Sequence, residues 1–520
     1  MAAICWISGG WELLVTLNTG PHSPTSFRKR KRRRRRGEEE SHGSCRTEHL
    51  KGGHPMQINV TLRARTQVAA LLRRLEQEAD QASGRRVPDR RTRQTWRQLV
   101  LGVLATGSTR MLTLGRTLAP RRRARTVQGV ANSLTYFFSQ AHFAVRPFST
   151  RLLEAGVRQL EPERLVTYHG KALVVLDPSE YAKRSRGTGK ADRQMEYIGR
   201  VRQPKASTRT RKKRTTRPAA PRAGGAAGRV ATTTGYVDVW AGLVLRGKQF
   251  LPLARHLFSS AHPHLKSQNT VEEAVLAQAL GVLRRVGLQA IVLGDSGLGR
   301  KELIIRLAQQ QQDCVLRLDP DITVFPTPED PGLLLADHLA QQPWRGEVLW
   351  DRGQEGRVRC RLRTARATIR FSRSGRQHDV QEATVNFVEL VPLNPDLTPL
   401  VLVTTLAITT PAQARAVARL YACRWAIETA FETMHAWGQE RFMVRKWVAI
   451  DRLLWILAIA YALLLLVLHH PKLHRFCAQA EALLRLLSVV GQRLTIGKLA
   501  EAIRLDWIRH DRAWTSGWLL

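Results

Sequence analysis

The sequence predicts an α/β protein in which helical regions lie on both sides of a strand-rich centre. Two apolar, β-branched runs, at 171–177 and 289–295, each end in an aspartate and alternate with helical patterns. Residues 314–408 have an alternating, β-branched pattern, which indicates a mostly antiparallel sheet segment. Helical periodicity dominates before residue 165 and again after residue 409.

The N-terminal segment, residues 1–55, differs from the rest of the chain. Nine consecutive basic residues, 28–36, precede a Gly/His/Ser-rich stretch, and this composition predicts a disordered basic extension. Two interpretations stay open: a polybasic arm for DNA, or a translated upstream sequence that is not native, with Met56 as the natural start. Amphipathic patterns at 68–82, 96–118 and 126–140 then predict a small helical DNA-binding domain over 56–165.

The central elements follow in order. The strand at 171–177 is followed by a basic, Gly/Pro/Ala-rich stretch, 183–229, which predicts a solvated loop that lies on a phosphate backbone. Two strands are expected at 232–245 and 248–258. A helix at 269–287 is expected to begin with Asn269 or Thr270 as its N-cap. The strand at 289–295 leads into a helix at 299–311.

The charge of the chain indicates its partner. Its 520 residues include 83 Lys and Arg against 42 Asp and Glu, which gives a formal net charge of +41. Such an excess favours a polyanionic partner, because each phosphate that Lys or Arg neutralises releases condensed counterions. The sequence therefore predicts nucleic-acid binding, and the alternative is a soluble protein that is merely basic.

The cysteines and the apolar runs indicate in which cellular compartment the protein is expected. The six cysteines are scattered and show no zinc spacing, which favours reduced thiols in a cytosolic protein. The first twenty residues lack a basic leading region, so a signal peptide is not expected. The longest apolar run, 453–468, falls short of the ~20 residues that span a bilayer. It therefore predicts a buried core helix, and no membrane partner is expected.

A polar line on the helical segment 421–435 is a candidate site. At ~100° per residue, Tyr421, Arg424, Glu428 and His435 fall within roughly 60° of one another. A surface ladder of ion pairs would give the same pattern. Asp177 and Asp295 are expected at the carboxyl ends of strands, the edge at which α/β sheets bind ligands.

Two other motifs near Asp295 are set aside. The letters GDSG at 294–297 resemble the nucleophile motif of trypsin-like serine proteases, but the high pI, the missing disulfide framework and the strand-turn-helix setting argue against it. GDSGLGRK is a near miss for a phosphate-binding P-loop. Arg300 stands in the lysine place and Lys301 in the hydroxyl place, so the magnesium ligand is absent.

The spacing Tyr421-x2-Arg424-x3-Glu428-x6-His435 resembles the Tyr-x2-Arg-x3-Glu-x6-Lys signature of bacterial DDE transposases of the insertion-sequence-four type. LDPSEYAKRSR (176–186) is similar to that family's first aspartate block and VLGDSGLGRKEL (292–303) to its second. The β-rich segment before the glutamate and the apolar tail also match, so that the resemblance covers about 165–470. One departure is His435, which stands at the signature lysine.

The resemblance implies an α/β, RNase H-like catalytic core in two parts, 166–313 and 409–470. A β-rich insertion at 314–408 would interrupt it, and a helical C-terminal region, 471–520, would follow. Asp177, Asp295 and Glu428 would be the catalytic residues and would bind two Mg²⁺ or Mn²⁺ ions, which suit carboxylate ligands. Tyr421, Arg424 and, in place of lysine, His435 would bind DNA.

The implied function is cut-and-paste DNA transposition by metal-dependent strand cleavage and strand transfer. The N-terminal helical domain would bind inverted-repeat ends, the partners would be those ends and target DNA, and a homodimer would form the synaptic complex in the bacterial cytoplasm. Trp344 or Trp350 would stack on a flipped base or belong to the core. Two alternatives stay open: an RNase H-like nuclease without strand transfer, and an inactive DNA-binding relic, which His435 and the N-terminal extension favour.

Overall fold

The computed structural model describes residues 3–7, 10–14, 64–81, 89–118, 126–140, 144–183, 195–202, 232–327, 329–351, 356–372, 379–440, 442–486 and 494–509. The chain divides into two compact units, 1–61 and 62–520. In the first unit, β1 (Ala3–Ile7) and β2 (Gly10–Leu14) form an antiparallel hairpin. The prediction for 1–55 contains no strand, although a Ser-Gly pair between two apolar runs favours a hairpin turn. The basic run at 28–36 lies outside the described residues, as does most of the basic stretch 183–229.

The second unit begins with five helices: α1 (Ala64–Gln81), α2 (Arg90–Thr106), α3 (Met111–Leu118), α4 (Val127–Gln140) and α5 (Val145–Arg158). The periodic segment at 96–118 is two helices, because Gly107 adopts a left-handed conformation with φ of 56° and ends α2. Helix α5 was not predicted from the sequence, although Phe148 on this helix packs edge-on against Trp96, with ring centroids 5.2 Å apart.

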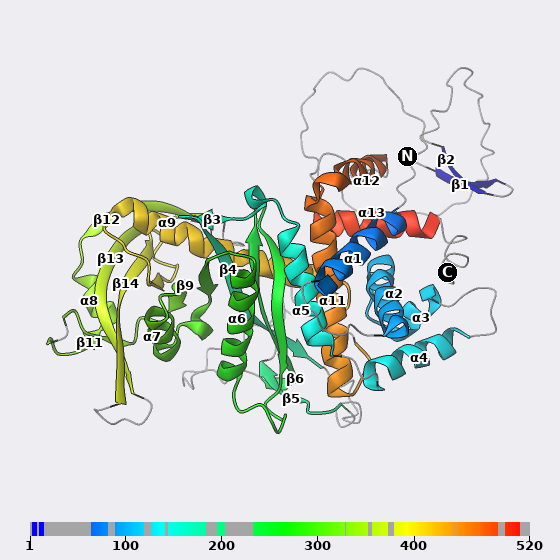
Figure 1. Ribbon diagram of the computed structural model, residues 1–520. Helices are drawn as coiled ribbons and strands as arrows, with labels where there is room; N and C mark the ends of the chain where they lie inside the picture. The colour runs from blue at the N-terminus through cyan, green and yellow to red at the C-terminus, as the bar shows by residue number, and fades with distance from the viewer. Residues whose placement is uncertain are drawn as a thin grey trace, which may run out of the picture. The chain divides into compact units, whose positions relative to one another are not determined.

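One eleven-stranded mixed sheet forms the centre of this unit (Figure 1). Its order is β12-β13-β14-β15-β9-β8-β4-β6-β5, with β7 also paired to β6 and β3 to β4. β4, β8 and β9 are parallel and the other pairs antiparallel. The strands are β3 (Thr167–Tyr168), β4 (Lys171–Ala182), β5 (Gly199–Arg202), β6 (Thr232–Leu245), β7 (Gln249–Phe258), β8 (Ala290–Gly294), β9 (Asp313–Leu318), β12 (Trp344–Asp351), β13 (Arg357–Ser372), β14 (Val380–Pro392) and β15 (Leu400–Thr404). This mixed α/β arrangement is compatible with an RNase H-like core.

The strands of the predicted insertion extend the central sheet. β9 pairs in parallel with β8, and β15 then pairs antiparallel with β9. β14, β13 and β12 follow outward, while β10 (Thr323–Val324) and β11 (Leu333–Leu334) form a separate two-stranded sheet. The strand character predicted for 314–408 is thus present. Its first strand belongs to the parallel part of the sheet, a pairing that sequence pattern alone does not reveal.

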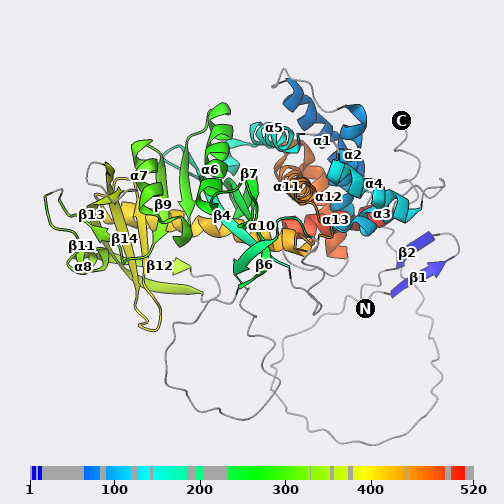
Figure 2. The ribbon, with the colours of Figure 1, turned by 90° about the horizontal axis from the view of Figure 1, so that it is seen from below.

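Helices cover both faces of the sheet. Figure 2 shows α6 (Gln268–Arg285) and α7 (Lys301–Gln309) on one face, and α9 (Pro411–Ala422) and α10 (Ala426–Ala436) on the other. The short α8 (Leu335–Ala340) packs beside β13. The N-cap predicted for α6 is wrong: Ser267 caps the helix, and its hydroxyl accepts a hydrogen bond from the Thr270 amide.

The long apolar helix α11 (Trp447–His469) joins the sheet to the helical region. It contacts β7 on one side and α2, α4 and α5 on the other, and α12 (His474–Leu486) and α13 (Ile496–Arg509) follow it. Among the described helices it alone is long and apolar enough to cross a membrane, yet 89% of its most apolar window is buried inside the protein. The predicted buried core helix is therefore confirmed.

A buried charge network ties α11 to the sheet. The Arg255 guanidinium on β7 contacts Asp238 of β6 at 2.7 Å and Asp451 of α11 at 2.8 Å. Tyr181 of β4 donates a hydrogen bond to Asp238, and Gln439 donates one to the Tyr181 hydroxyl. The pair of Arg255 and Asp238 is fully buried, so each charge depends on its partner.

Replacing Asp238 by alanine should lower the free energy of unfolding by about 3–5 kcal/mol, because it leaves the buried Arg255 charge short of a partner. Urea denaturation would measure the loss. The control is Lys248→Ala, which breaks an exposed pair with Asp351 and should cost at most about 1 kcal/mol. Equal losses in the two variants would contradict the role of the buried network.

Candidate active site

Asp177 lies where the parallel pairing of the sheet ends. β4 and β8 pair as far as Leu176 and Gly294, and Asp177 is the next residue on β4. The predicted strand end at Asp177 is wrong, because β4 continues to Ala182 through its antiparallel pairing with β6. Asp177 therefore lies inside a strand, at the carboxyl end of its parallel section, and only 9% of it is exposed.

Asp295 follows β8 directly, as predicted. It begins the short 3₁₀ turn Ser296–Leu298, and its Oδ1 accepts a hydrogen bond of 2.8 Å from the Ser296 amide. The turn closes tightly onto β9 at Gly299. A Cβ atom there would lie 2.2 Å from the Arg317 carbonyl oxygen, so only glycine fits and the turn stays fixed.

The helical segment 421–435 is interrupted, in contrast to the prediction of one helix. α9 ends at Ala422, the 3₁₀ turn Cys423–Trp425 follows, and α10 begins at Ala426. A 3₁₀ turn has ~3 residues per turn, so the projection at ~100° per residue fails across it. Tyr421 is on α9, Arg424 is in the turn, and Glu428 and His435 are on α10.

The guanidinium of Arg424 meets all three predicted carboxylates. Its Nη1 lies 3.2 Å from Asp177 Oδ2 and 3.4 Å from Glu428 Oε1, and its Nη2 lies 3.9 Å from Asp295 Oδ2. The Arg424 side chain is 6% exposed, whereas that of Glu428 is 40% exposed. Residues from β4, from the turn after β8 and from α10 thus converge on one cation. A surface ladder of ion pairs does not account for this arrangement, since Arg424 is buried and two of its partners lie far away in the sequence.

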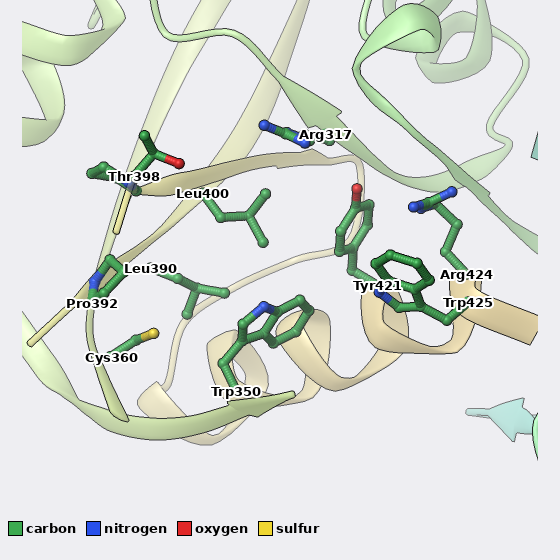
Figure 3. A pocket seen from close by; sticks show the side chains of 11 residues that line it. Arg317, Trp350, Cys360, Leu390, Pro392, Thr398, Leu400, Tyr421, Arg424 and Trp425 are labelled. Carbon is green, nitrogen blue, oxygen red and sulfur yellow. The ribbon is translucent and has the colours of Figure 1, made fainter. Parts of the chain in front are cut away.

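Tyr421 and Arg317 complete the surroundings of Asp295. The Tyr421 hydroxyl donates a hydrogen bond of 3.2 Å to Asp295 Oδ1, and Arg317 Nη1 lies 3.8 Å from the same oxygen. Figure 3 shows the Tyr421 side chain between those of Arg317 and Arg424. Arg317 was not predicted as a site residue; it is a half-buried arginine between the buried residues Leu316 and Leu318 of β9.

The electrostatics differ among these groups. Burial has the largest effect on Asp177, and together with the neighbouring carboxylates it outweighs Arg424 and raises the pKa of Asp177 to about 8. Burial also raises the pKa of Tyr421, with Asp295 adding to the effect. Burial by itself would lower the pKa of Arg424, but the charges around it, with Asp177 first, raise that pKa. Arg424 is therefore held as a cation.

A fourth carboxylate, Glu272 on α6, lies close enough for its charge to raise the pKa of Asp177. Glu272 is buried, and its Oε2 lies 2.6 Å from Arg300 Nη1. The same Arg300 nitrogen donates a hydrogen bond of 2.9 Å to the Gly297 carbonyl oxygen in the turn after Asp295. This arginine, which occupies the lysine place of the rejected P-loop motif, thus connects α6 to the Asp295 turn. Only the folded chain brings Glu272 here, so its place in the site could not be predicted from the sequence.

His435 lies apart from this cluster. Its Nδ1 is 3.7 Å from Glu440 Oε1, and its ring stacks at 6.4 Å on that of Phe431. Among the contacts of the described residues, none joins His435 to the three carboxylates. Its DNA-binding role stays a prediction.

A cavity of about 180 Å³ adjoins the cluster. Trp350, Tyr421 and Trp425 line it together with Arg317 and Arg424 (Figure 3). The rings of Trp350 and Tyr421 are nearly parallel, with an interplanar angle of 19° and centroids 6.0 Å apart. Trp350 is largely buried, as the core interpretation expects, whereas Trp344 is 45% exposed and lies away from the cavity lining.

The donor chemistry of the cluster fits a hard divalent cation, because Asp177, Asp295 and Glu428 offer only carboxylate oxygens. The positions of these three carboxylates do not by themselves form a metal site. Within the part of the chain that the structure describes, no three His, Cys, Asp or Glu side chains lie close enough to hold a metal ion. The guanidinium of Arg424 stands between the carboxylates, so a metal ion bound there would take the place of this cation.

Sequence comparison finds one family similar to part of this chain. Residues 256–463 match the transposase DDE domain. The match includes Asp295, Tyr421, Arg424, Glu428 and His435, and it begins after Asp177. It covers less than half of the chain and supports a DDE transposase family. A search of curated proteins found no match.

Proposed function

We propose that this chain is a bacterial DNA transposase of the insertion-sequence-four type. It would bind inverted-repeat transposon ends and catalyse cut-and-paste transposition by strand cleavage and strand transfer. The observation that carries the proposal is the convergence of Asp177, Asp295 and Glu428 on Arg424 from three separate elements. The transposase DDE domain match supports the same assignment.

In this proposal Asp177, Asp295 and Glu428 hold two Mg²⁺ or Mn²⁺ ions. When bound, the ions would activate water or a DNA 3′-hydroxyl and stabilise the leaving 3′-oxygen at phosphorus. The chain positions the three ligands by different means. Pairing with β6 fixes Asp177, the closed turn at Gly299 fixes Asp295, and α10 carries Glu428.

Arg424 and Tyr421 would contact phosphates of the transposon end. In the described structure Arg424 already provides a buried guanidinium, and its Nε has no hydrogen-bond partner. Once other cations neutralise the carboxylates, the planar guanidinium of Arg424 can donate two parallel hydrogen bonds to one phosphate. Tyr421 can offer its hydroxyl in the same way, since its present acceptor is Asp295.

The remaining parts of the proposal rest on the resemblance. The helices before residue 165 would recognise the inverted repeats, and the strongly basic composition suits duplex DNA. The protein would act in the bacterial cytoplasm on the chromosome, as a homodimer that joins two ends. Residues 56–165, 314–408 and 471–520 are proposed as the end-binding domain, the insertion and the C-terminal helical region.

A strand-transfer assay tests the proposed function. Purified full-length protein would be mixed with labelled duplexes that carry the element's own ends, with a supercoiled target plasmid and with Mg²⁺ or Mn²⁺. A transposase should cut the ends and join them to the plasmid. Cutting without joining would favour a nuclease, and binding without cutting would favour an inactive relic. Either outcome overturns the proposal.

Replacing His435 by lysine should preserve or raise end binding and cleavage. Neutral imidazole, with a reference pKa of ~6.5, is a weaker phosphate partner than an ammonium at pH 7.5. The lysine would also remain within reach of Glu440, the present partner of His435. Gel-shift titration and end cleavage would measure both effects. A severe loss would assign His435 to packing against Phe431 and Tyr181 instead.

A further inference from the structure

The outer strands of the sheet carry a row of arginines away from the candidate active site. On β13, residues 357, 359, 361 and 363 are all arginine. Alternate residues of a strand project from the same face, so these four side chains share one face, here called the arginine face. Arg357, Arg359 and Arg361 are exposed and Arg363 is half-buried. Figure 1 shows β12 and β13 at the end of the sheet distant from α11.

The neighbouring strand adds apolar groups to this face. Trp344 of β12 pairs with Arg363, and Leu349 pairs with Arg359. Both apolar side chains are unusually open, with 45% of Trp344 and 56% of Leu349 exposed. The guanidinium carbon of Arg363 lies 4.9 Å from the centroid of the Trp344 ring, and that of Arg361 lies 5.8 Å from it. An exposed tryptophan next to two guanidinium groups is typical of a binding surface. Proteins bind nucleic acids through aromatic and cationic side chains of this kind.

The acidic residues near this face do not neutralise it. Arg363 pairs with Glu389, and Asp351 pairs with Lys248. Glu347 stands opposite Arg361 in the strand register. Among the ion pairs of the described residues, none involves Arg357, Arg359 or Arg361. These three exposed charges are available to an external anion.

The opposite face of the same strands belongs to the core. Cys360 and Leu362, which alternate with the arginines, are buried, and Cys360 lines the cavity beside Tyr421. The arginine face therefore points away from that cavity. A DNA end held at the carboxylates cannot occupy both surfaces of the sheet through the same few nucleotides, so the arginine face suits a different stretch of duplex.

The spacing of the arginines fits a phosphate backbone. Alternate residues of a strand are about 7 Å apart, and the four arginines span about 20 Å. Phosphates on one strand of duplex DNA rise about 3.4 Å each along the axis and also wind around it, so neighbouring phosphates lie roughly 7 Å apart. Side chains at this spacing can follow the backbone without reading bases, which is the mode of sequence-independent binding.

We infer that the arginine face binds the backbone of a target DNA duplex, without sequence preference. The inference rests on the proposed function, because only a transposase needs a second duplex beside the transposon end. The face supplies three free guanidinium groups to phosphates, while Trp344 and Leu349 supply apolar contact to the sugar edges. In this arrangement target DNA binds at the arginine face, and transposon ends bind at other parts of the chain.

The test uses the full-length double variant Arg359→Gln/Arg361→Gln and a matched control, Arg366→Gln/Arg284→Gln. The control removes the same charge from exposed positions off the arginine face. Fluorescence anisotropy would measure binding of a labelled random-sequence duplex over a range of salt concentrations. The slope of the logarithm of the DNA-binding constant against the logarithm of salt concentration should become shallower by up to ~1.8 in the variant. Each of the two lost phosphate contacts accounts for ~0.9. The control should keep the parental slope.

End cleavage and target joining distinguish a failure of the arginine face to bind target DNA from a failure of the proposed transposase function. The variant should cut labelled ends like its parent and join them to plasmid less efficiently. A slope and joining efficiency equal to those of the control, with normal end cleavage, would overturn the inference alone. A parent that cannot cut ends would overturn the proposed function. An RNA duplex of the same length serves as a second probe, and loss of RNA binding with DNA binding retained would also overturn the inference.

Discussion

Asp177→Asn and Asp295→Asn should each reduce cleavage of a labelled transposon-end duplex by several orders of magnitude. Each change keeps the size of the side chain and removes a negative charge from the proposed metal-binding cluster. The lost metal activation is worth several kcal/mol at the transition state, and about 1.4 kcal/mol corresponds to a tenfold change in rate. Combining the two changes should add little, because residues that act as one unit are not additive.

DNA binding should survive in both variants, because end recognition is assigned to other residues and the phosphates lose one negative neighbour. Gel-shift on the same protein preparations would check this. The matched control is Asp313→Asn at the beginning of β9, a half-buried aspartate that pairs with Lys171. It should cut ends like its parent. Loss of activity in the control, or full activity in Asp177→Asn, would contradict the assignment.

In the metal-free protein, Asp177 should make the folded state less stable as the pH rises from 4 to 8. The pKa of Asp177 is about 8 when folded, against its ordinary value of 3.8. Between these values the folded state keeps a proton that the unfolded state has lost. The contribution of Asp177 is therefore full below pH 4 and decreases by roughly 1.4 kcal/mol per pH unit until pH passes 8.

Urea denaturation in the presence of a chelator, at pH 5, 6.5 and 8, would measure this dependence. Other groups also titrate in this range, so the informative quantity is the difference between the parent and Asp177→Asn. The variant should lose the Asp177 share of the slope. Mg²⁺ should flatten the slope of the parent, because a bound cation favours the ionised carboxylate. Equal slopes in the two proteins would contradict the raised pKa.

The sequence predicts the local elements better than their pairing. Apolar runs correctly located β8, and an uninterrupted apolar stretch correctly located the buried helix α11. The sequence did not reveal that β9 and β15 continue the central sheet. These two strands are about 85 residues apart in the chain, and they pair through backbone groups that every residue has. The end of β4 was misplaced for a similar reason: β6 extends the strand beyond Asp177.

The candidate site shows the same division. Asp295 was predicted from a strand followed by a turn, and Glu428 from its spacing to Arg424. The central position of Arg424 was not predictable, because Asp177 and Asp295 reach it from other elements that only the tertiary fold brings together. Glu272 and Arg317 reach the site from α6 and β9, elements whose placement depends on the tertiary fold.

Cleavage by Glu428→Gln is the most direct test of metal binding by the three carboxylates, because Glu428 is the carboxylate for which a surface ion pair is the strongest alternative. Its side chain is 40% exposed and stands four residues after Arg424. The measurement is cleavage of a labelled end duplex with Mg²⁺ or Mn²⁺, beside a gel-shift on the same protein. If Glu428 binds metal, cleavage should fall by orders of magnitude while the gel-shift persists. If it is only a partner of Arg424, the change should cost ~0.3–0.5 kcal/mol of stability, and the variant should bind and cut like its parent.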